Sequence, residues 1–512
     1  MMDAILAAIP QTADKIIDLG CNTGWVARQV ARAFPDARVV GVDVNPAMIE
    51  VAREAARLEA SAAEFVCVDG AAMQDVARGA DVIICGGSAA FFERPQDVYR
   101  AVARCLEPDG LLIDCHYIYD ADAPLSLRQE EQEMFGLGWM PNGLCDIAAV
   151  YEDAGLTVNK IRRLSRFRFE ETAAARLARS ILHAVPGMQE LVDAMTERRR
   201  LIGQLARYRY PYLLVAGSGR PVAAYPPAQR EITKALATLD LFSMPIPREP
   251  MEVLRGYLPY RFLAYVGDPD AAPGGGRAVD VLARTLQTLG IGPDARVLDI
   301  GCFTGLSTIV LARYFSEVTG LDIEEQFVNI ASAVGRTLAS PACFIVGDGA
   351  GTGFPSDHFD AVTMTATLAY TPRPLAMLAE ARRVLKPNGL LAEFVYHHHD
   401  RRPETEKKIR EAVGPDVVLA PLSQRLAMFE TAGFELVDLI VVDTGAASPT
   451  EQSMLQEYIA HRERLLDGSK TSEDIQEFSE LFTHYTGRLS EHVEKPVAYL
   501  CLFAKSEARP LE

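Results

Sequence analysis

The sequence predicts an α/β protein in which two doubly wound, Rossmann-like domains follow one another, each with a mostly parallel seven-stranded sheet. Three observations predict this fold class. The chain has 512 residues, which is more than one ordinary domain needs. A set of landmarks occurs twice in the same order. Short β-branched apolar runs alternate with segments of helical periodicity, as in βαβ units.

The first copy shows this alternation from its start. Residues 16–19, 38–42 and 82–85 are short apolar runs bounded by Gly or Asp, and they are typical of strands buried on both faces. Residues 25–34 and 46–58 lie between them with helical periodicity. We expect no helix before the first strand of this copy, whereas a helix over residues 278–289 is expected to precede the second.

The repeat itself is defined by acids, turns and a last strand. Asp18 recurs as Asp299, 281 residues later, and YLLVAGS near residue 212 recurs as YLCLFAKS near residue 499. The other landmarks recur 279 residues later: Asp43, Asp69 and Asp81 as Asp322, Asp348 and Asp360, and CLEPDGLLI as VLKPNGLLA. We infer from these repeated landmarks that the chain contains two homologous domains in tandem.

The domain boundaries follow from composition. We expect an N-terminal domain over residues 1–219, a Pro- and Gly-rich linker with helical segments over 220–277, and a C-terminal domain over 278–512. Before its last strand each copy has a polar, helical insertion, at about residues 170–208 and 448–493. These insertions are expected to fold over an acceptor pocket as lids.

The charge and the cysteines exclude several function classes. With 51 basic and 69 acidic residues the net charge is −18, so nucleic acid and anionic membranes are unfavoured partners. The nine cysteines include no Cys-x-x-Cys pair, no apolar run is long enough to span a membrane, and the N-terminus has no basic segment typical of a signal peptide. A cytoplasmic protein with reduced thiols is expected, and a homodimer is a further expectation.

A glycine turn with acids at three strand ends is the main functional pattern. Asp18, Gly20 and Gly24 lie where the first strand turns into a helix, and the glycines permit a tight turn and close approach of a ligand. Asp43 ends the second strand, where a carboxylate can accept both hydroxyls of a ribose, and Asp69 follows the third strand. The second copy repeats the set as Asp299, Gly301, Gly305, Asp322 and Asp348.

Taken together, this order of residues resembles that of the class I S-adenosylmethionine-dependent methyltransferases, over about residues 15–120 and 295–399. The resemblance implies S-adenosylmethionine as the cofactor. It implies that Asp18 and Asp299 lie near the methionine moiety, Gly20, Gly24, Gly301 and Gly305 form the turn, Asp43 and Asp322 bind the ribose, and Asp69 and Asp348 lie beside the adenine. The family's middle glycine is Asn22 here and Phe303 in the second copy. A nicotinamide dinucleotide fits less well, because neither turn has the G-x-G-x-x-G spacing.

Each of these residues also has a purely structural interpretation. A glycine in a strand-to-helix turn is required in many α/β proteins that bind nothing, and an aspartate at a strand end can cap the next helix. The joint, duplicated pattern favours a functional site in at least one copy.

The acceptor should lie beyond the carboxyl ends of the strands, where His116, His397 and His398 follow the fifth strand of each copy. A histidine there can deprotonate an acceptor, or it can belong to a solvated loop. No metal is expected, because consecutive histidines do not converge on one ion. The arginine-rich segment RRRLIGQLARYRYPY is either a solvated helix face or a cationic rim for an anionic acceptor.

The functional expectation is therefore methyl transfer from S-adenosylmethionine to oxygen, nitrogen or carbon of a small-molecule acceptor, with two cofactor sites in one chain. The tandem phosphoethanolamine methyltransferases share this layout, at the level of architecture only. Two alternatives stay open: a methyltransferase acting on RNA or protein, and a non-catalytic S-adenosylmethionine-binding or regulatory protein in which one domain or both are silent.

Overall fold

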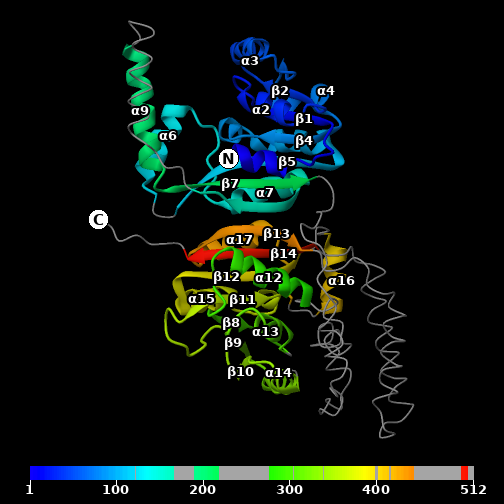
Figure 1. Ribbon diagram of the computed structural model, residues 1–512, viewed down its shortest axis with the longest axis vertical. Helices are drawn as coiled ribbons and strands as arrows, with labels where there is room; N and C mark the ends of the chain where they lie inside the picture. Colours follow the sequence, from blue (N-terminus) through cyan, green and yellow to red (C-terminus); the bar gives the residue numbers. More distant parts are fainter. Residues whose placement is uncertain are drawn as a thin grey trace, which may run out of the picture. The chain divides into compact units, whose positions relative to one another are not determined.

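The computed structural model describes residues 1–120, 123–165, 189–217, 276–303, 305–337, 339–397, 402–413, 417–442 and 497–505. The chain folds into two compact units (Figure 1). The first is formed mainly by Met1–Pro221 and the second mainly by Val222–Pro421 and Met428–Lys505. The expected linker lies outside the described residues except for its last two positions. The insertion expected at 448–493 and His398 also lie outside them.

The N-terminal unit is built on a sheet with the strand order β3-β2-β1-β4-β5-β7-β6. Its strands run parallel except β7, which is antiparallel to both of its neighbours. The strands are β1 (Lys15–Leu19), β2 (Arg38–Asp43), β3 (Glu64–Cys67), β4 (Ala80–Cys85), β5 (Leu106–Tyr119), β6 (Thr157–Arg163) and β7 (Arg209–Gly217). This order reverses direction beside β1, as in doubly wound folds.

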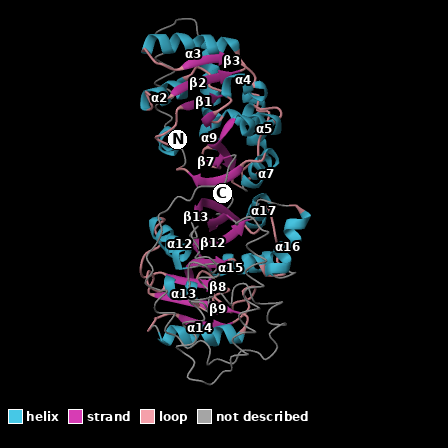
Figure 2. Ribbon diagram, turned by 90° about the vertical axis from the view of Figure 1, so that its right-hand side faces the viewer, coloured by secondary structure: helices cyan, strands magenta, loops and turns pink. Residues whose placement is uncertain are grey.

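Helices lie on both faces of this sheet, and Figure 2 shows α2 on one side and α5 and α7 on the other. The helices are α1 (Met2–Ala8), α2 (Trp25–Ala33), α3 (Pro46–Glu59), α4 (Gln74–Ala77), α5 (Pro95–Cys105), α6 (Leu125–Phe135), α7 (Leu144–Ala154) and α9 (Gln189–Leu205). Local chemistry fixes the start of α3, where the Asn45 side chain accepts a hydrogen bond from the Ala47 N–H and Pro46 occupies the first turn.

The C-terminal unit repeats this architecture, with the strand order β10-β9-β8-β11-β12-β14-β13 and an antiparallel β14. The strands are β8 (Arg296–Ile300), β9 (Glu317–Asp322), β10 (Cys343–Val346), β11 (Phe359–Thr365), β12 (Leu385–His397), β13 (Phe434–Val442) and β14 (Val497–Lys505). The helices are α12 (Gly276–Thr288), α13 (Leu306–Leu311), α14 (Glu325–Thr337), α15 (Pro374–Val384), α16 (Pro403–Val413) and α17 (Leu422–Thr431). The predicted duplicated, doubly wound α/β fold is confirmed.

One expectation about the first copy is wrong, because a helix does precede its first strand. Helix α1 places Ile5 in the hydrophobic core, and Ile9 follows it there, with 2% and 3% of their surfaces exposed. Ile9 is the residue that caps α1, and burial of Ile5 and Ile9 stabilises even a helix of 7 residues.

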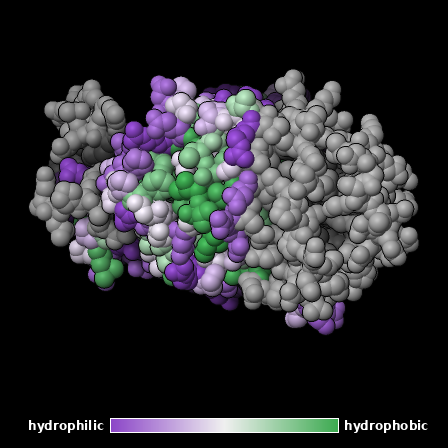
Figure 3. Space-filling model, turned by 90° about the horizontal axis from the view of Figure 1, so that it is seen from below, coloured by the Kyte–Doolittle hydropathy of each residue, from purple (hydrophilic) through white to green (hydrophobic). Residues whose placement is uncertain are grey.

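Each unit has its own apolar core between the sheet and the helices. A smaller cluster joins α6, α9 and the end of β5 through Tyr119, Leu201 and Leu205. Seen from below, where β9, β10 and α14 lie in Figure 1, the surface carries a patch of apolar residues between hydrophilic ones (Figure 3). In the part of the chain that the structure describes, no helix is both long and apolar enough to span a bilayer.

Candidate cofactor and acceptor sites

The glycine turn of the N-terminal unit joins β1 to α2. Gly20 and Gly24 have φ of +69° and +74°, a left-handed conformation that glycine adopts without strain. The Gly20 N–H donates to the Val42 carbonyl over 2.8 Å, which fixes the turn to β2. A Cβ on Gly20 would lie 2.3 Å from the Ser88 Cβ, and a Cβ on Gly24 would lie 2.4 Å from the Phe65 ring.

The turn of the C-terminal unit repeats these contacts. A Cβ on Gly301 would lie 2.4 Å from the Thr367 side chain, and one on Gly305 would lie 2.8 Å from the Phe344 ring. The residues that crowd the glycines are thus the protein's own. Close approach of a ligand is therefore not the reason that the structure gives for these glycines, which the packing of the turn already requires.

The acid before each turn is buried. Asp18 accepts a hydrogen bond from the Ala27 N–H over 3.0 Å, and burial raises its pKa to about 7. Asp299 accepts hydrogen bonds from three hydroxyls, those of Ser307, Thr308 and Thr363, at 2.5, 2.7 and 2.9 Å. Burial raises the pKa of Asp299 as well, and these hydroxyls oppose the shift.

The acids after the second strands are held by backbone amides in the same way. Asp43 accepts from the N–H of Asn22 over 2.8 Å and of Asn45 over 2.9 Å. Asp322 accepts from the N–H of Phe303 over 2.9 Å and of Glu324 over 3.0 Å. Each carboxylate has about four acceptor positions, so these bonds orient it and leave capacity for a ribose diol.

An exposed apolar side chain follows each of these acids, and the sequence reasoning missed both. Val44 and Ile323 expose 68% and 63% of their surfaces directly beside Asp43 and Asp322. A β-branched apolar side chain in this position can cover one face of a planar heterocycle. The signal was available, since both residues follow the paired acids at the same shift of 279.

The acids after the third strands differ between the units. Asp69 is exposed and accepts from the Ala71 N–H over 2.9 Å. Asp348 accepts the matching bond from Ala350 over 2.8 Å and also forms an ion pair of 2.5 Å with Arg373. These two bonds hold the pKa of Asp348 below its ordinary value.

The set of groups at the strand ends fits a nucleoside cofactor. In each unit an oriented carboxylate, an exposed β-branched side chain and a second carboxylate follow neighbouring strands at the carboxyl edge of the sheet. The residues that would hold S-adenosylmethionine are Asp18, Asp43, Val44 and Asp69 in the N-terminal unit, and Asp299, Asp322, Ile323 and Asp348 in the C-terminal unit.

His116 lies on β5 and is joined to a buried polar network. Its Nε2 is 3.0 Å from Oδ2 of Asp114, which is fully buried and also accepts from the hydroxyls of Tyr151, over 2.8 Å, and Tyr99. Burial acts to raise the pKa of Asp114, but His116 and the two tyrosines together hold it below its ordinary value. The aspartate thus stays charged and orients the imidazole through Nε2.

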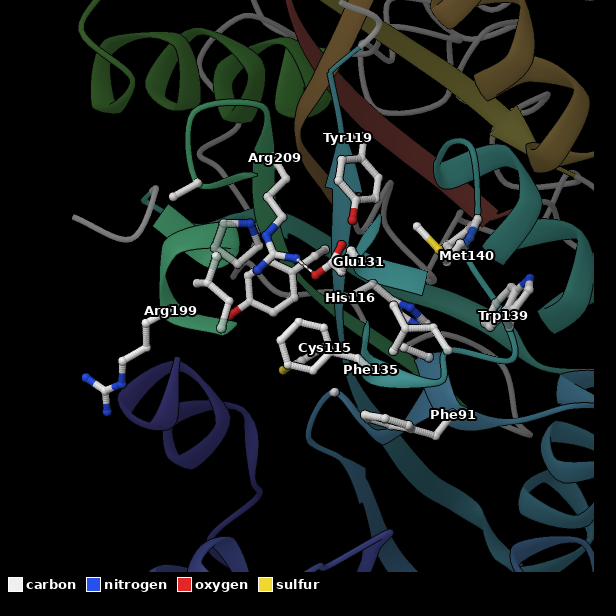
Figure 4. A pocket seen from close by; sticks show the side chains of 18 residues that line it. Phe91, Cys115, His116, Tyr119, Glu131, Phe135, Trp139, Met140, Arg199 and Arg209 are labelled. Atoms are coloured by element: carbon white, nitrogen blue, oxygen red, sulfur yellow. Dashed lines mark hydrogen bonds and ion pairs between the residues drawn. The ribbon is translucent and has the colours of Figure 1, made fainter. Parts of the chain in front are cut away.

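Within the described residues, Nδ1 of His116 has no hydrogen-bond partner, and the side chain lines a cavity of about 520 Å³. Figure 4 shows this cavity among β5, α6 and α9, with aromatic side chains around it. Its apolar wall includes Phe91, Tyr119, Phe135 and Trp139, and the Trp139 ring meets the His116 ring edge to face at 5.4 Å. A volume of this size suits a small molecule.

Part of the insertion expected at 170–208 borders the cavity. Helix α9 contributes Arg199 and Ile202 to its lining. Arg209, from the same arginine-rich segment, forms a buried ion pair with Glu131, whereas Arg200 bonds Glu130 and Glu197 on the surface. The segment is therefore divided between the cavity and the solvent.

The C-terminal unit has different residues at the matching places. The register of the sheets pairs Asp114 with Cys85 and Leu214, and it pairs Glu393 with Met364 and Cys501 in the same way. His116 is matched in this register by Val395. On the helices, Leu378 lies 279 residues after Tyr99, and Phe429 precedes Gly433 by four residues as Tyr151 precedes Gly155; all three counterparts are buried. His397 lies two residues beyond the position that matches His116, with its ring 5.7 Å from that of Tyr499. His116 and His397 are not equivalent.

Comparison with known proteins gives a family for both units. Residues 16–110 and residues 298–392 each match a family model described as a methyltransferase domain. Over 176 residues the chain is 30% identical to a sterol 24-C-methyltransferase of Gibberella zeae. This aligned region is 31% of this chain and 46% of that protein. Over 137 residues it is 35% identical to a fatty-acid O-methyltransferase of Mycolicibacterium smegmatis. This aligned region is 26% of this chain and 47% of that protein.

The chain thus spans less than half the length of these curated relatives. Among solved structures, phosphoethanolamine N-methyltransferase 2 of Haemonchus contortus, in complex with phosphomonomethylethanolamine and S-adenosylhomocysteine, aligns over 96% of this chain and 94% of that one, with 14% identity and a TM-score of 0.36. The two family matches, one on each repeat, confirm the duplication read from the sequence. The chain carries two class I S-adenosylmethionine-dependent methyltransferase domains in tandem.

Proposed function

We propose that the chain transfers a methyl group from S-adenosylmethionine to a hydroxyl or amine of a small molecule, and that the N-terminal unit holds this acceptor. The observation that carries the proposal is His116, oriented by a buried aspartate and lining a cavity of about 520 Å³ at the carboxyl end of β5. Acceptors bind beyond this edge in doubly wound sheets.

When bound, S-adenosylmethionine supplies an electrophilic methyl group, whose bond to sulfur breaks as its bond to the acceptor forms. The residues of the chain align the acceptor and manage its proton. Nδ1 of His116 takes the proton that the acceptor loses, and the charge of Asp114 stabilises the resulting imidazolium. Tyr99 and Tyr151 keep Asp114 ionised and in place. The aromatic wall excludes water from the acceptor.

We further propose a cofactor site in each unit, with Asp43 and Asp322 as the ribose-binding acids and Asp69 and Asp348 beside the adenine. The matching amide bonds to Asp43 and Asp322 support this. In the C-terminal unit Arg373 competes for Asp348, and apolar residues replace His116 and its two tyrosines. These differences favour a C-terminal unit that binds the cofactor without the proton chemistry of the N-terminal unit.

The test uses the purified full chain with methyl-labelled S-adenosylmethionine and a metabolite extract. We expect the label in the small-molecule fraction, and a count of two cofactor equivalents by calorimetry. Label found only in added RNA or protein would contradict the small-molecule acceptor. Binding of the cofactor with no transfer to any fraction would favour a regulatory protein.

A further inference from the structure

A buried ion pair on the cavity wall is not used by the proposed proton chemistry. Glu131 comes from α6 and Arg209 begins β7, and their side chains are only 7% and 12% exposed. The Arg209 guanidinium also lies 4.5 Å from the centre of the Tyr117 ring. Figure 4 shows the Glu131 carboxylate beside this guanidinium, among the side chains that line the cavity.

Only one oxygen of this carboxylate is engaged. Oε1 of Glu131 receives the Arg209 bond, whereas Oε2 is buried and has no hydrogen-bond partner in the described parts of the chain. A buried acceptor oxygen without a partner is unfavourable, because it has lost its hydrogen bonds to water without replacement. Because Glu131 lines the cavity, a small rotation of its carboxylate lets a donor on a molecule bound there satisfy this oxygen.

The surroundings indicate what kind of donor fits. The charge of Glu131 is already balanced by Arg209, so an ammonium group beside the pair would leave an unbalanced positive charge in a buried place, which is unfavourable. A hydroxyl or a neutral N–H carries no such penalty. The rest of the wall is largely apolar, with Phe91, Phe135 and Trp139. The ligand body should therefore be apolar and of ring size.

We propose that Glu131 determines acceptor specificity by accepting a hydrogen bond at Oε2 from a second, uncharged donor of the acceptor. The acceptor is then an apolar molecule with two donor groups, one facing His116 and one facing Glu131. This proposal rests on the proposed function, because it assumes that the cavity is the acceptor site.

The test measures binding rather than turnover, with the full chain saturated with S-adenosylhomocysteine. The probes are naphthols and hydroxybiphenyls, each compared by calorimetry with the dihydroxy isomers of the same ring system. We expect at least one dihydroxy compound to bind about tenfold more tightly than its monohydroxy partner. Glu131→Gln should reduce this preference to less than about threefold.

Glu130→Gln is the matched control, because Glu130 is the preceding residue of α6 and bonds Arg200 on the surface. This variant should keep the preference. If no dihydroxy compound binds better than its partner, or if Glu131→Gln keeps the preference, the proposal is wrong. If Glu131→Gln fails to fold, the comparison of dihydroxy with monohydroxy compounds on the wild-type chain still tests the proposal. Failure of the proposed function would differ, since dihydroxy compounds would bind selectively and yet never be methylated with S-adenosylmethionine present.

Discussion

The two units share their turns and strand-end acids but differ on the strand that follows them. In both, a glycine turn packs on a hydroxyl side chain, Ser88 or Thr367, and an aspartate is held by two backbone amides. At the matching positions of β5 and β12, however, one unit has an Asp-His pair and the other has Glu393 and Val395. The parts that would hold a cofactor are duplicated, whereas the parts that would manage an acceptor are not.

This contrast separates two kinds of constraint. The turn is fixed by the fold, because any side chain at Gly20 or Gly301 would meet another residue at 2.3–2.4 Å. The two tyrosines that bond Asp114 are not needed by the fold, since Leu378 and Phe429 fill the places of Tyr99 and Tyr151 in the other unit. Buried tyrosines that hold a carboxylate in one unit, and that apolar residues replace in the homologous core, point to function.

The largest effect is expected from His116→Ala. Removal of the general base should lower kcat by about 10²–10⁴-fold with little change in cofactor affinity. Val395→Ala, at the matching position, should leave kcat within about twofold. Initial rates with an acceptor that the wild-type chain methylates give kcat, and calorimetric titration gives the affinity for the cofactor. Equal losses in the two variants would remove the distinction between the units.

A smaller effect is expected at Asp18 and Asp299, whose burial makes the stability of the protein depend on pH. Asp18 has a folded pKa of about 7 against an ordinary 3.8, so the folded state keeps a proton that the unfolded state releases. The contribution of Asp18 to the free energy of unfolding is therefore present at low pH and is lost as the pH rises from about 4 to about 7. The loss is at most about 1.4 kcal/mol per pH unit.

Asp18→Asn should therefore flatten this decline in the free energy of unfolding, measured by denaturant titration at several pH values. Asp299→Asn should flatten it less, because three hydroxyls stabilise the charged form of Asp299. An unchanged slope in Asp18→Asn would contradict the buried, partly protonated carboxyl.

The smallest effect is expected from Arg373→Ala. The ion pair between Arg373 and Asp348 is largely exposed, so releasing Asp348 should strengthen cofactor binding in the C-terminal unit by no more than about fivefold. Arg94, at the matching place, bonds Asp97 at 3.5 Å, and Arg94→Ala should leave cofactor binding unchanged. Two-site calorimetry resolves the comparison, and weaker binding in Arg373→Ala would mean that this arginine contacts the cofactor.

Much of this architecture could be predicted because it is written in local patterns. Strand β1 and helices α2 and α3 lie within one residue of their predicted bounds, since burial and periodicity are local properties. Helix α1 was missed because 7 residues give too short a period to recognise. Asp114 could have been found, as a charged residue two positions before His116 on an apolar strand shares its face.

Tyr99 and Tyr151 could not have been found in this way. They come from α5 and α7 and meet Asp114 only once those helices pack against the sheet. The same holds for Glu131 and Arg209, which are 78 residues apart in the chain. Contacts between distant elements depend on the folded geometry, which no local pattern encodes.

We propose that both units bind the cofactor but that only the N-terminal unit transfers the methyl group. The most direct test of this proposal compares Asp43→Ala with Asp322→Ala in single-turnover methyl transfer at limiting S-adenosylmethionine. Each variant should lose one calorimetric cofactor equivalent. We expect product formation to disappear in Asp43→Ala and to stay above half of the wild-type amplitude in Asp322→Ala. Product that persists in Asp43→Ala but vanishes in Asp322→Ala would contradict the placement of methyl transfer in the N-terminal unit.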